Sequence, residues 1–177
     1  STTRPEDVAG DFANRQGGSS LIIVDGGACE VGVESTVIDL SSSLETPAIL
    51  RPGVITTSQI REVIGDVTDQ RQERQGDAPG TARRHYAPTI PLQVVTDPAS
   101  CSLLPPRSVI IAPEGVQVEG DHIRRLPATA AGFGRGLYAA LHDAQQGEFD
   151  QIVIVTPDLH LPSWAAISDR LYRASSV

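Results

Sequence analysis

The sequence DGGACEVGVESTVIDL, residues 25–40, decides the organisation of the first half of the chain. It follows the run LIIV at 21–24, which is rich in β-branched residues and predicts a short buried strand, because the run is too short to form a helix. The last residues of the stretch, 36–40, predict a second strand. The glycine-rich segment between them is therefore predicted to be a loop that joins two strands.

This loop has two interpretations. Gly26, Gly27 and Gly32 permit positive φ and close approach of the backbone, so main-chain N–H groups beside the hydroxyls of Ser35 and Thr36 can receive an anion or a carboxylate. The alternative is a tight turn that binds nothing, because Gly-Gly commonly marks turns. The local pattern taken alone favours the plain turn.

Further segments favour the ligand loop, because they match one family in the same order. Residues 25–40 resemble the signature Asp-Gly-Gly-x-Cys-x-x-Gly-x-Glu-Ser-Thr-Val-x-Asp of YrdC-like threonylcarbamoyl-AMP synthases. Residues 1–3 (STT) are similar to a stretch that opens a helix in this family, and residues 49–53 (ILRPG) are similar to its Leu-Arg-Pro-Gly strand end. Residues 78–88 resemble the linker of the two-domain members, and residues 137–171 resemble their extra C-terminal domain.

The resemblance implies an enzymatic activity. The family converts L-threonine, bicarbonate and ATP to threonylcarbamoyl-AMP and pyrophosphate, the first half of making threonylcarbamoyladenosine in tRNA. The expected partners are these three substrates and, downstream, the tRNA-modification machinery. Mg²⁺ is expected to accompany ATP, with no tightly bound cofactor. Catalysis is expected to depend on positioning and desolvation and not on a covalent nucleophile, and no catalytic residue is assigned.

The resemblance also implies roles for individual residues. Ser35 matches the serine that contacts L-threonine, and Arg51 matches the arginine that contacts the nucleotide. Ser1 aligns beside a main-chain contact to the nucleotide. His85 and Tyr86 keep the pattern of the linker, which in the relatives supplies residues to the nucleotide site, although the bulky basic stretch that usually precedes them is replaced here.

Three polar residues of the same stretch are expected to be structural. Thr36 follows Ser35 along a strand and should point to the opposite face. Glu34 and Asp39 have the chemistry of general bases, but a structural role is the favoured interpretation.

Composition limits the other function classes. The formal net charge of −8 argues against a nucleic-acid-binding protein, which needs a basic face. The sequence shows no apolar run of about 20 residues and no signal-peptide pattern, so no membrane association and a cytoplasmic location are expected. The two cysteines and four histidines are scattered without metal-ligand spacing, and no metal site is expected.

Some of the family's motifs are missing. All 14 basic residues are arginine, so the Lys-x-Arg motif of the family's first half is absent, and its Ser-x-Asn motif is not found either. We therefore expect the chain to be the C-terminal part of a two-domain synthase and to be inactive as it stands. The alternative is a non-catalytic nucleotide- or partner-binding regulatory module. A sheet without its first strands would expose an apolar face, which predicts a homodimer or strand exchange through residues 20–51.

The predicted fold class is α/β, with the second half of a YrdC-like α/β domain at 1–65, a linker at 66–91 and a small Rossmann-like domain at 92–177. Strands are predicted at 92–96, 108–112 and 151–155, and helices at 128–146 and 162–174, which favours a mostly parallel sheet. In the first half, Thr3 is the predicted N-cap of a helix over 5–12, and a capping box begins another helix at Thr56. The glycines at 132–136 offer a weak alternative of a phosphate-binding loop.

Overall fold

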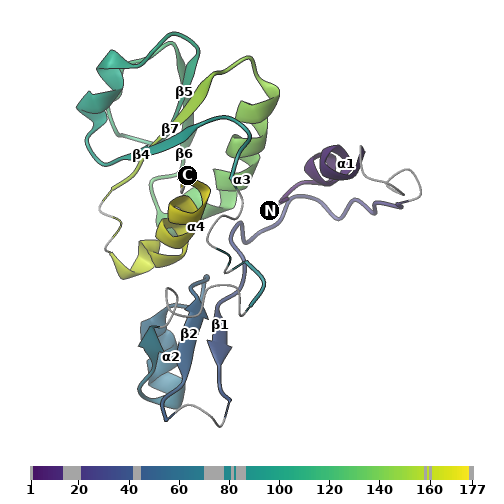
Figure 1. Ribbon diagram of the computed structural model, residues 1–177, viewed down its shortest axis with the longest axis vertical. Helices are drawn as coiled ribbons and strands as arrows, with labels where there is room; N and C mark the ends of the chain where they lie inside the picture. The colour runs from purple at the N-terminus through teal and green to yellow at the C-terminus, as the bar shows by residue number, and fades with distance from the viewer. Residues whose placement is uncertain are drawn as a thin grey trace.

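The computed structural model describes residues 2–13, 21–41, 45–69, 78–80, 82, 87–157, 159 and 161–175. It is an α/β protein with two separate sheets, as predicted (Figure 1). Three of the predicted site residues, Ser1, His85 and Tyr86, lie outside the described residues. Among the described residues, no helix is long and apolar enough to cross a membrane.

The larger sheet has four parallel strands in the order β4-β7-β5-β6. These strands are β4 (Leu92–Val95), β5 (Ser108–Pro113), β6 (His122–Leu126) and β7 (Gln151–Val155). The sequence predicted all of them except β6. That strand lies at the edge of the sheet, and its side chains are exposed apart from Leu126, so it lacks the apolar run that marks a buried strand.

Each face of this sheet has its own hydrophobic core. Ile111 and Ile154 point to the face covered by α3 (Ala130–Gln146) and α4 (Ala165–Ser175). The neighbours of these two isoleucines along the strands point to the other face, which packs against the 3₁₀ helix η2 (Pro98–Leu103). After their first residues, Ser108 and Gln151, β5 and β7 are therefore apolar on both faces, which is why sequence alone identified them.

The two long helices follow their sequence patterns. Thr129 caps α3 by accepting a hydrogen bond from the Gly132 backbone N–H at 3.2 Å. The predicted helix at 162–174 is divided, because the 3₁₀ turn η3 (Pro162–Trp164) precedes α4. Trp164 is 4% exposed and its ring centroid lies 5.2 Å from that of Phe133, so it is a core residue.

The smaller sheet joins three short strands in the order β1-β2-β3. Strand β1 (Val37–Asp39) is antiparallel to β2 (Ala48–Arg51), and β3 (Thr68–Asp69) is parallel to β2. The helix α2 (Thr57–Ile64) covers this sheet and begins with the predicted capping box of Thr56 and Gln59. Strand β3 lies within the predicted linker, and the domain boundaries at 65 and 91 stay a prediction.

Two sequence predictions about the N-terminal region are wrong. Residues 21–24 form no strand and are not buried, since Ile22 is 86% and Val24 is 87% exposed. A β-branched run becomes a buried strand only when a neighbouring strand pairs with it, and none of the described residues does so here. The helix α1 (Pro5–Ala13) forms as predicted, but Thr3 is not its N-cap. The Arg4 carbonyl accepts the first backbone hydrogen bond of the helix, and the buried Thr3 hydroxyl has no hydrogen-bond partner among the described residues.

Candidate functional site

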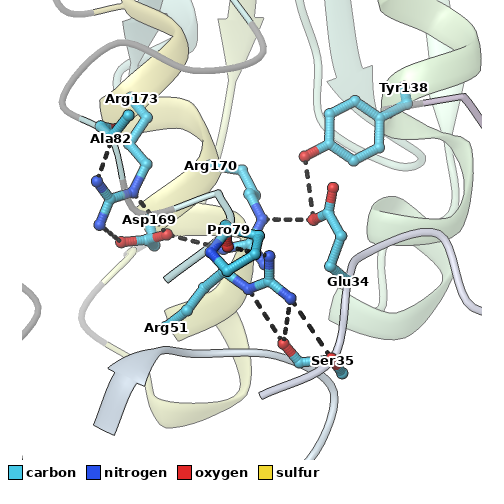
Figure 2. Close-up of polar contacts among 9 residues, drawn as sticks. All are labelled: Glu34, Ser35, Arg51, Pro79, Ala82, Tyr138, Asp169, Arg170 and Arg173. Atoms are coloured by element: carbon cyan, nitrogen blue, oxygen red, sulfur yellow. Dashed lines mark hydrogen bonds and ion pairs between the residues drawn. The ribbon is translucent and has the colours of Figure 1, made fainter. Parts of the chain in front are cut away.

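Ser35 and Arg51, which the sequence assigned to two substrates, lie in direct contact (Figure 2). Arg51 is the last residue of β2 and is 7% exposed. Its Nε and one terminal nitrogen donate to the Ser35 carbonyl at 3.2 and 3.0 Å, and the same terminal nitrogen reaches the Ser35 hydroxyl at 3.4 Å. The planar guanidinium therefore fixes the backbone of the signature loop beside the serine hydroxyl.

Arg51 also connects this loop to the linker. Its other terminal nitrogen donates to the Pro79 carbonyl at 2.6 Å. Pro79 belongs to the short segment 78–80, which ends at Gly80, a glycine with positive φ. One buried side chain thus connects the signature loop, the end of β2 and the linker.

Gly53 makes this arrangement sterically possible. A Cβ at this position would overlap the backbone of Glu34, Ser35 and Thr36. The Leu-Arg-Pro-Gly and Glu-Ser-Thr motifs are therefore packed backbone against backbone, and only glycine permits that approach. This contact gives a physical reason for the glycine that follows Arg51-Pro52.

Glu34, immediately before Ser35, is held by side chains of α3 and α4. Its Oε2 accepts a hydrogen bond from Arg170 Nε at 2.7 Å and one from the Tyr138 hydroxyl at 3.5 Å (Figure 2). Arg170 lies on α4 and Tyr138 on α3. Burial alone would lower the pKa of Arg170, but the hydrogen bond and the charge of Glu34 raise it above its ordinary value. Glu34 is thus engaged in an ion pair in this structure.

The ion pair continues along α4. Asp169 accepts a hydrogen bond from Arg170 at 2.7 Å and two from Arg173 at 3.0 and 3.1 Å. Arg173 in turn donates to the Ala82 carbonyl of the linker at 2.9 Å. We call Glu34, Arg170, Asp169 and Arg173 the ion chain.

A second set of contacts holds the middle of the signature loop, and the residues just before α1, against α3. Gly32 lies so close to the backbone of Gly134 and Arg135 that a Cβ at Gly32 would overlap it. Arg4, ahead of α1, forms ion pairs with Asp7 and with Asp143 of α3, both at 2.7 Å. Chiefly through the hydrogen bond to Asp7, these carboxylates raise the pKa of Arg4.

The glycines at 132–136 have a packing role. All of them lie in α3 and not in a loop that follows a strand, which removes the context that a phosphate-binding loop requires. Gly134 packs against Val33 and Ile167, and a Cβ at Gly136 would meet the Leu126 side chain. The close approach of the signature loop to α3 explains why small residues occur here.

The other polar residues of the signature stretch have structural contacts. The Thr36 hydroxyl donates to the Ile55 carbonyl at 2.6 Å, and Thr36 lies just before β1, so its place on the opposite strand face stays a prediction. Asp39 accepts a hydrogen bond from the Ser41 backbone N–H at 2.7 Å.

Sequence reasoning proposed Ser35 and Arg51, which the structure places in contact, but it missed the members of the ion chain on α4. The spacing of Asp169 and Arg173 is that of a helical i,i+4 ion pair and was a usable signal. No local signal connects Glu34 to Arg170, which the fold alone brings together. Within the described part of the chain, no group of three His, Cys, Asp or Glu residues is placed to hold a metal ion.

Comparison with known proteins identifies the family. The model of the family described as "Threonylcarbamoyl-AMP synthase, C-terminal domain" matches residues 55–176. The chain belongs to this family. Threonylcarbamoyl-AMP synthase of Bacillus subtilis is 44% identical over 98 residues, which are 53% of this chain and 27% of that protein. The enzyme of Pyrococcus abyssi is 39% identical over 103 residues, which are 55% of this chain and 28% of that protein.

Solved structures extend the likeness across the chain. A crystal structure of P. abyssi Sua5 complexed with L-threonine aligns with a TM-score of 0.81 and 30% identity, covering 99% of this chain and 54% of that one. A P. abyssi Sua5 variant with a histidine and a tyrosine replaced by alanine aligns with a TM-score of 0.72 and 26% identity, covering 99% of this chain and 53% of that one. The chain thus spans about half the length of these Sua5 chains, and its matches cover about a quarter of the named threonylcarbamoyl-AMP synthases.

Proposed function

We propose that this chain supplies the C-terminal half of a threonylcarbamoyl-AMP synthase, which makes threonylcarbamoyl-AMP and pyrophosphate from L-threonine, bicarbonate and ATP. The product would pass to the tRNA-modification machinery, in the cytoplasm. The observation that carries the proposal is the direct contact of Ser35 with Arg51, beneath the linker carbonyl of Pro79. The alignment over 99% of the chain with a Sua5 that binds L-threonine supports it.

Ser35 is the proposed L-threonine contact. Its backbone is fixed by Arg51 and the preceding Glu34 by Arg170, so the hydroxyl is held at a defined point of a rigid loop. A preorganised hydroxyl can make a directional hydrogen bond to an amino acid at low entropic cost. Catalysis by positioning requires such preorganisation.

Arg51 is the proposed nucleotide contact within the described residues. Three of its nitrogen atoms already donate to the carbonyls of Ser35 and Pro79. A phosphate oxygen would therefore either take a remaining N–H or displace the Pro79 carbonyl, since a charged oxygen is the stronger acceptor. Ser1, His85 and Tyr86 are proposed to complete the nucleotide site.

Mg²⁺ is proposed to arrive with ATP as part of the substrate. The ion prefers oxygen ligands and is commonly held by substrate phosphates together with one or two carboxylates.

A threonine-dependent assay tests the proposal. Pyrophosphate release would be measured with ATP, Mg²⁺ and bicarbonate, with and without L-threonine, for the chain alone and after addition of a polypeptide that carries the Lys-x-Arg and Ser-x-Asn motifs. We expect release only in the complemented mixture and only with L-threonine. Ser35→Ala should abolish it, whereas Ser102→Ala, whose hydroxyl donates only to the Ala99 carbonyl within η2, should not.

Calorimetric titration with L-threonine separates the enzyme from the regulatory alternative. Binding that depends on Ser35 supports the proposed function. Absence of both binding and complemented release would leave the non-catalytic module as the better description.

We also propose that the exposed apolar run at 21–24 mediates self-association. Ile22 and Val24 are almost fully exposed and Val31 is 52% exposed, which is unusual for side chains of this kind in an isolated domain. Sedimentation velocity of the wild type and of Ile22→Ser/Val24→Ser tests this. A wild type that sediments as a monomer at high concentration would exclude the dimer.

A further inference from the structure

We infer that helix α4 positions the L-threonine site, with Arg170, Asp169 and Arg173 acting as positioning residues for Ser35. The inference rests on the proposed function, because it takes Ser35 as the threonine contact. The contact of this helix with the loop that we use is the one between Arg170 and Glu34. The three residues act through Glu34, the residue before Ser35 (Figure 2).

The ion chain is neutral and buried. Charges alternate along it, from the Glu34 carboxylate through Arg170 and Asp169 to Arg173. The side chains of the three α4 residues are 5% exposed or less, and that of Glu34 is 20% exposed. Buried ion pairs add little net stability compared with apolar side chains of the same size, but they define geometry, because each charge must keep its partner.

The ion chain has one end at the signature loop and one end at the linker. Glu34 is the loop end, and Arg173 reaches the linker by donating to the Ala82 carbonyl at 2.9 Å. Arg51 makes a second and independent bridge between the same two segments, from Ser35 to Pro79. The two bridges begin at the consecutive residues Glu34 and Ser35 and end at Ala82 and Pro79, so two separate sets of contacts hold the loop at the proposed threonine contact.

The ion chain predicts energetic coupling between distant positions. Replacing Arg173 by a neutral residue removes the positive charge beside Asp169. Asp169 should then bind Arg170 more strongly, which weakens the ion pair between Arg170 and Glu34. The position of Ser35 therefore depends on a residue of the C-terminal domain. By reciprocity, a ligand that fixes Ser35 must stabilise the contact of Arg173 with the linker.

The test measures L-threonine affinity by calorimetry in the full chain and in Arg173→Gln, Glu34→Gln and the double variant. We expect each single change to weaken binding about tenfold, a typical size for coupling between sites. The double variant should be no weaker than the worse single variant, because either change already breaks the ion chain. Arg173→Lys should recover part of the loss, since it keeps the charge beside Asp169.

Arg107→Gln is the matched control. Arg107 also forms ion pairs within the C-terminal domain, with Asp150 at 3.2 Å and Glu148 at 4.0 Å, but it is 53% exposed and belongs to neither bridge. Its substitution should leave threonine affinity unchanged. Thermal unfolding of every variant confirms that the chain is folded under the conditions of the titration.

Hydrogen exchange gives a readout that does not depend on threonine. Arg173→Gln should speed amide exchange of peptides covering residues 33–37 in the ligand-free chain, while Arg107→Gln should not. Unchanged exchange, or additive losses of affinity in the double variant, would overturn the inference. If the wild type fails to bind L-threonine but Arg173→Gln still speeds exchange at residues 33–37, the proposed function is rejected and the role of the ion chain in positioning the loop is kept.

Discussion

Arg51 lies across the backbone of Ser35, with two of its nitrogen atoms donating to the same carbonyl oxygen at 3.2 and 3.0 Å. The two residues belong to different motifs, one at the end of β2 and one just before β1. Their contact converts two sequence motifs into one site. It also means that the proposed nucleotide contact and the proposed threonine contact cannot move independently.

Arg51→Lys should destabilise the protein by about 2 kcal/mol, because a lysine cannot reach the carbonyls of Ser35 and Pro79 together and leaves a buried acceptor without its charged donor. The free energy of unfolding from denaturant titration measures this. Arg125→Lys is the control, since Arg125 also donates to two carbonyls, those of Pro113 and Val116, but is exposed. The control should lose less than about 1 kcal/mol. Equal losses of unfolding free energy in the two variants would show that the burial of Arg51 does not add to the stabilising effect of its hydrogen bonds.

Gly53→Ala should cost about 2 kcal/mol or more and weaken L-threonine binding. Its new methyl group would meet backbone atoms of Glu34, Ser35 and Thr36, which cannot rotate away as a side chain can. Gly10→Ala is the matched control, because a Cβ there meets no described atom within 4 Å and alanine is the better helix former by about 1 kcal/mol. Thermal unfolding should therefore shift in opposite directions for the two variants, and a downward shift for both would contradict the packing argument.

The sequence predicted those elements of the fold that have a local residue pattern, and it failed where tertiary contacts decide the structure. Strands β5 and β7 are continuous apolar runs, and the buried face of α3 has helical spacing, so local patterns were sufficient. Strand β6 was not predicted, because an exposed edge strand with two arginines has no apolar run. At 21–24 a strand was predicted that the structure does not contain, since a strong strand pattern does not supply the neighbouring strand that must pair with it.

The candidate site was predictable where a motif carried it. The Glu-Ser-Thr and Leu-Arg-Pro-Gly motifs led to Ser35 and Arg51, and the structure adds their contact. The contact of Glu34 with Arg170 joins residues 136 positions apart, which composition and periodicity cannot reveal. Charged residues on a helix such as α4 are usually on a solvated face, and only the tertiary structure shows that these three are buried.

The two cysteines should react at very different rates. Cys29 is exposed and Cys101 is buried, and both are free thiols. Burial raises the pKa of the Cys101 thiol, with a smaller contribution from the charge of Asp97, so little reactive thiolate is present there. Titration with a disulfide reagent at pH 8 should modify one thiol quickly and the second only in denaturant. Cys29→Ser should remove the fast phase, and a fast phase that persisted in that variant would show that the region around Cys101 opens readily.

Replacing two threonines by valine should have opposite effects on stability. The Thr156 hydroxyl is buried at the end of β7 and has no hydrogen-bond partner among the described residues, so Thr156→Val should stabilise the protein by about 1 kcal/mol. The Thr36 hydroxyl donates to the Ile55 carbonyl at 2.6 Å, so Thr36→Val should destabilise it by about 1 kcal/mol. Both substitutions keep the shape of the side chain, which leaves the hydrogen bond as the main difference. The midpoints of urea unfolding measure both effects, and a destabilised Thr156→Val would indicate that a bound water or ligand satisfies this hydroxyl in solution.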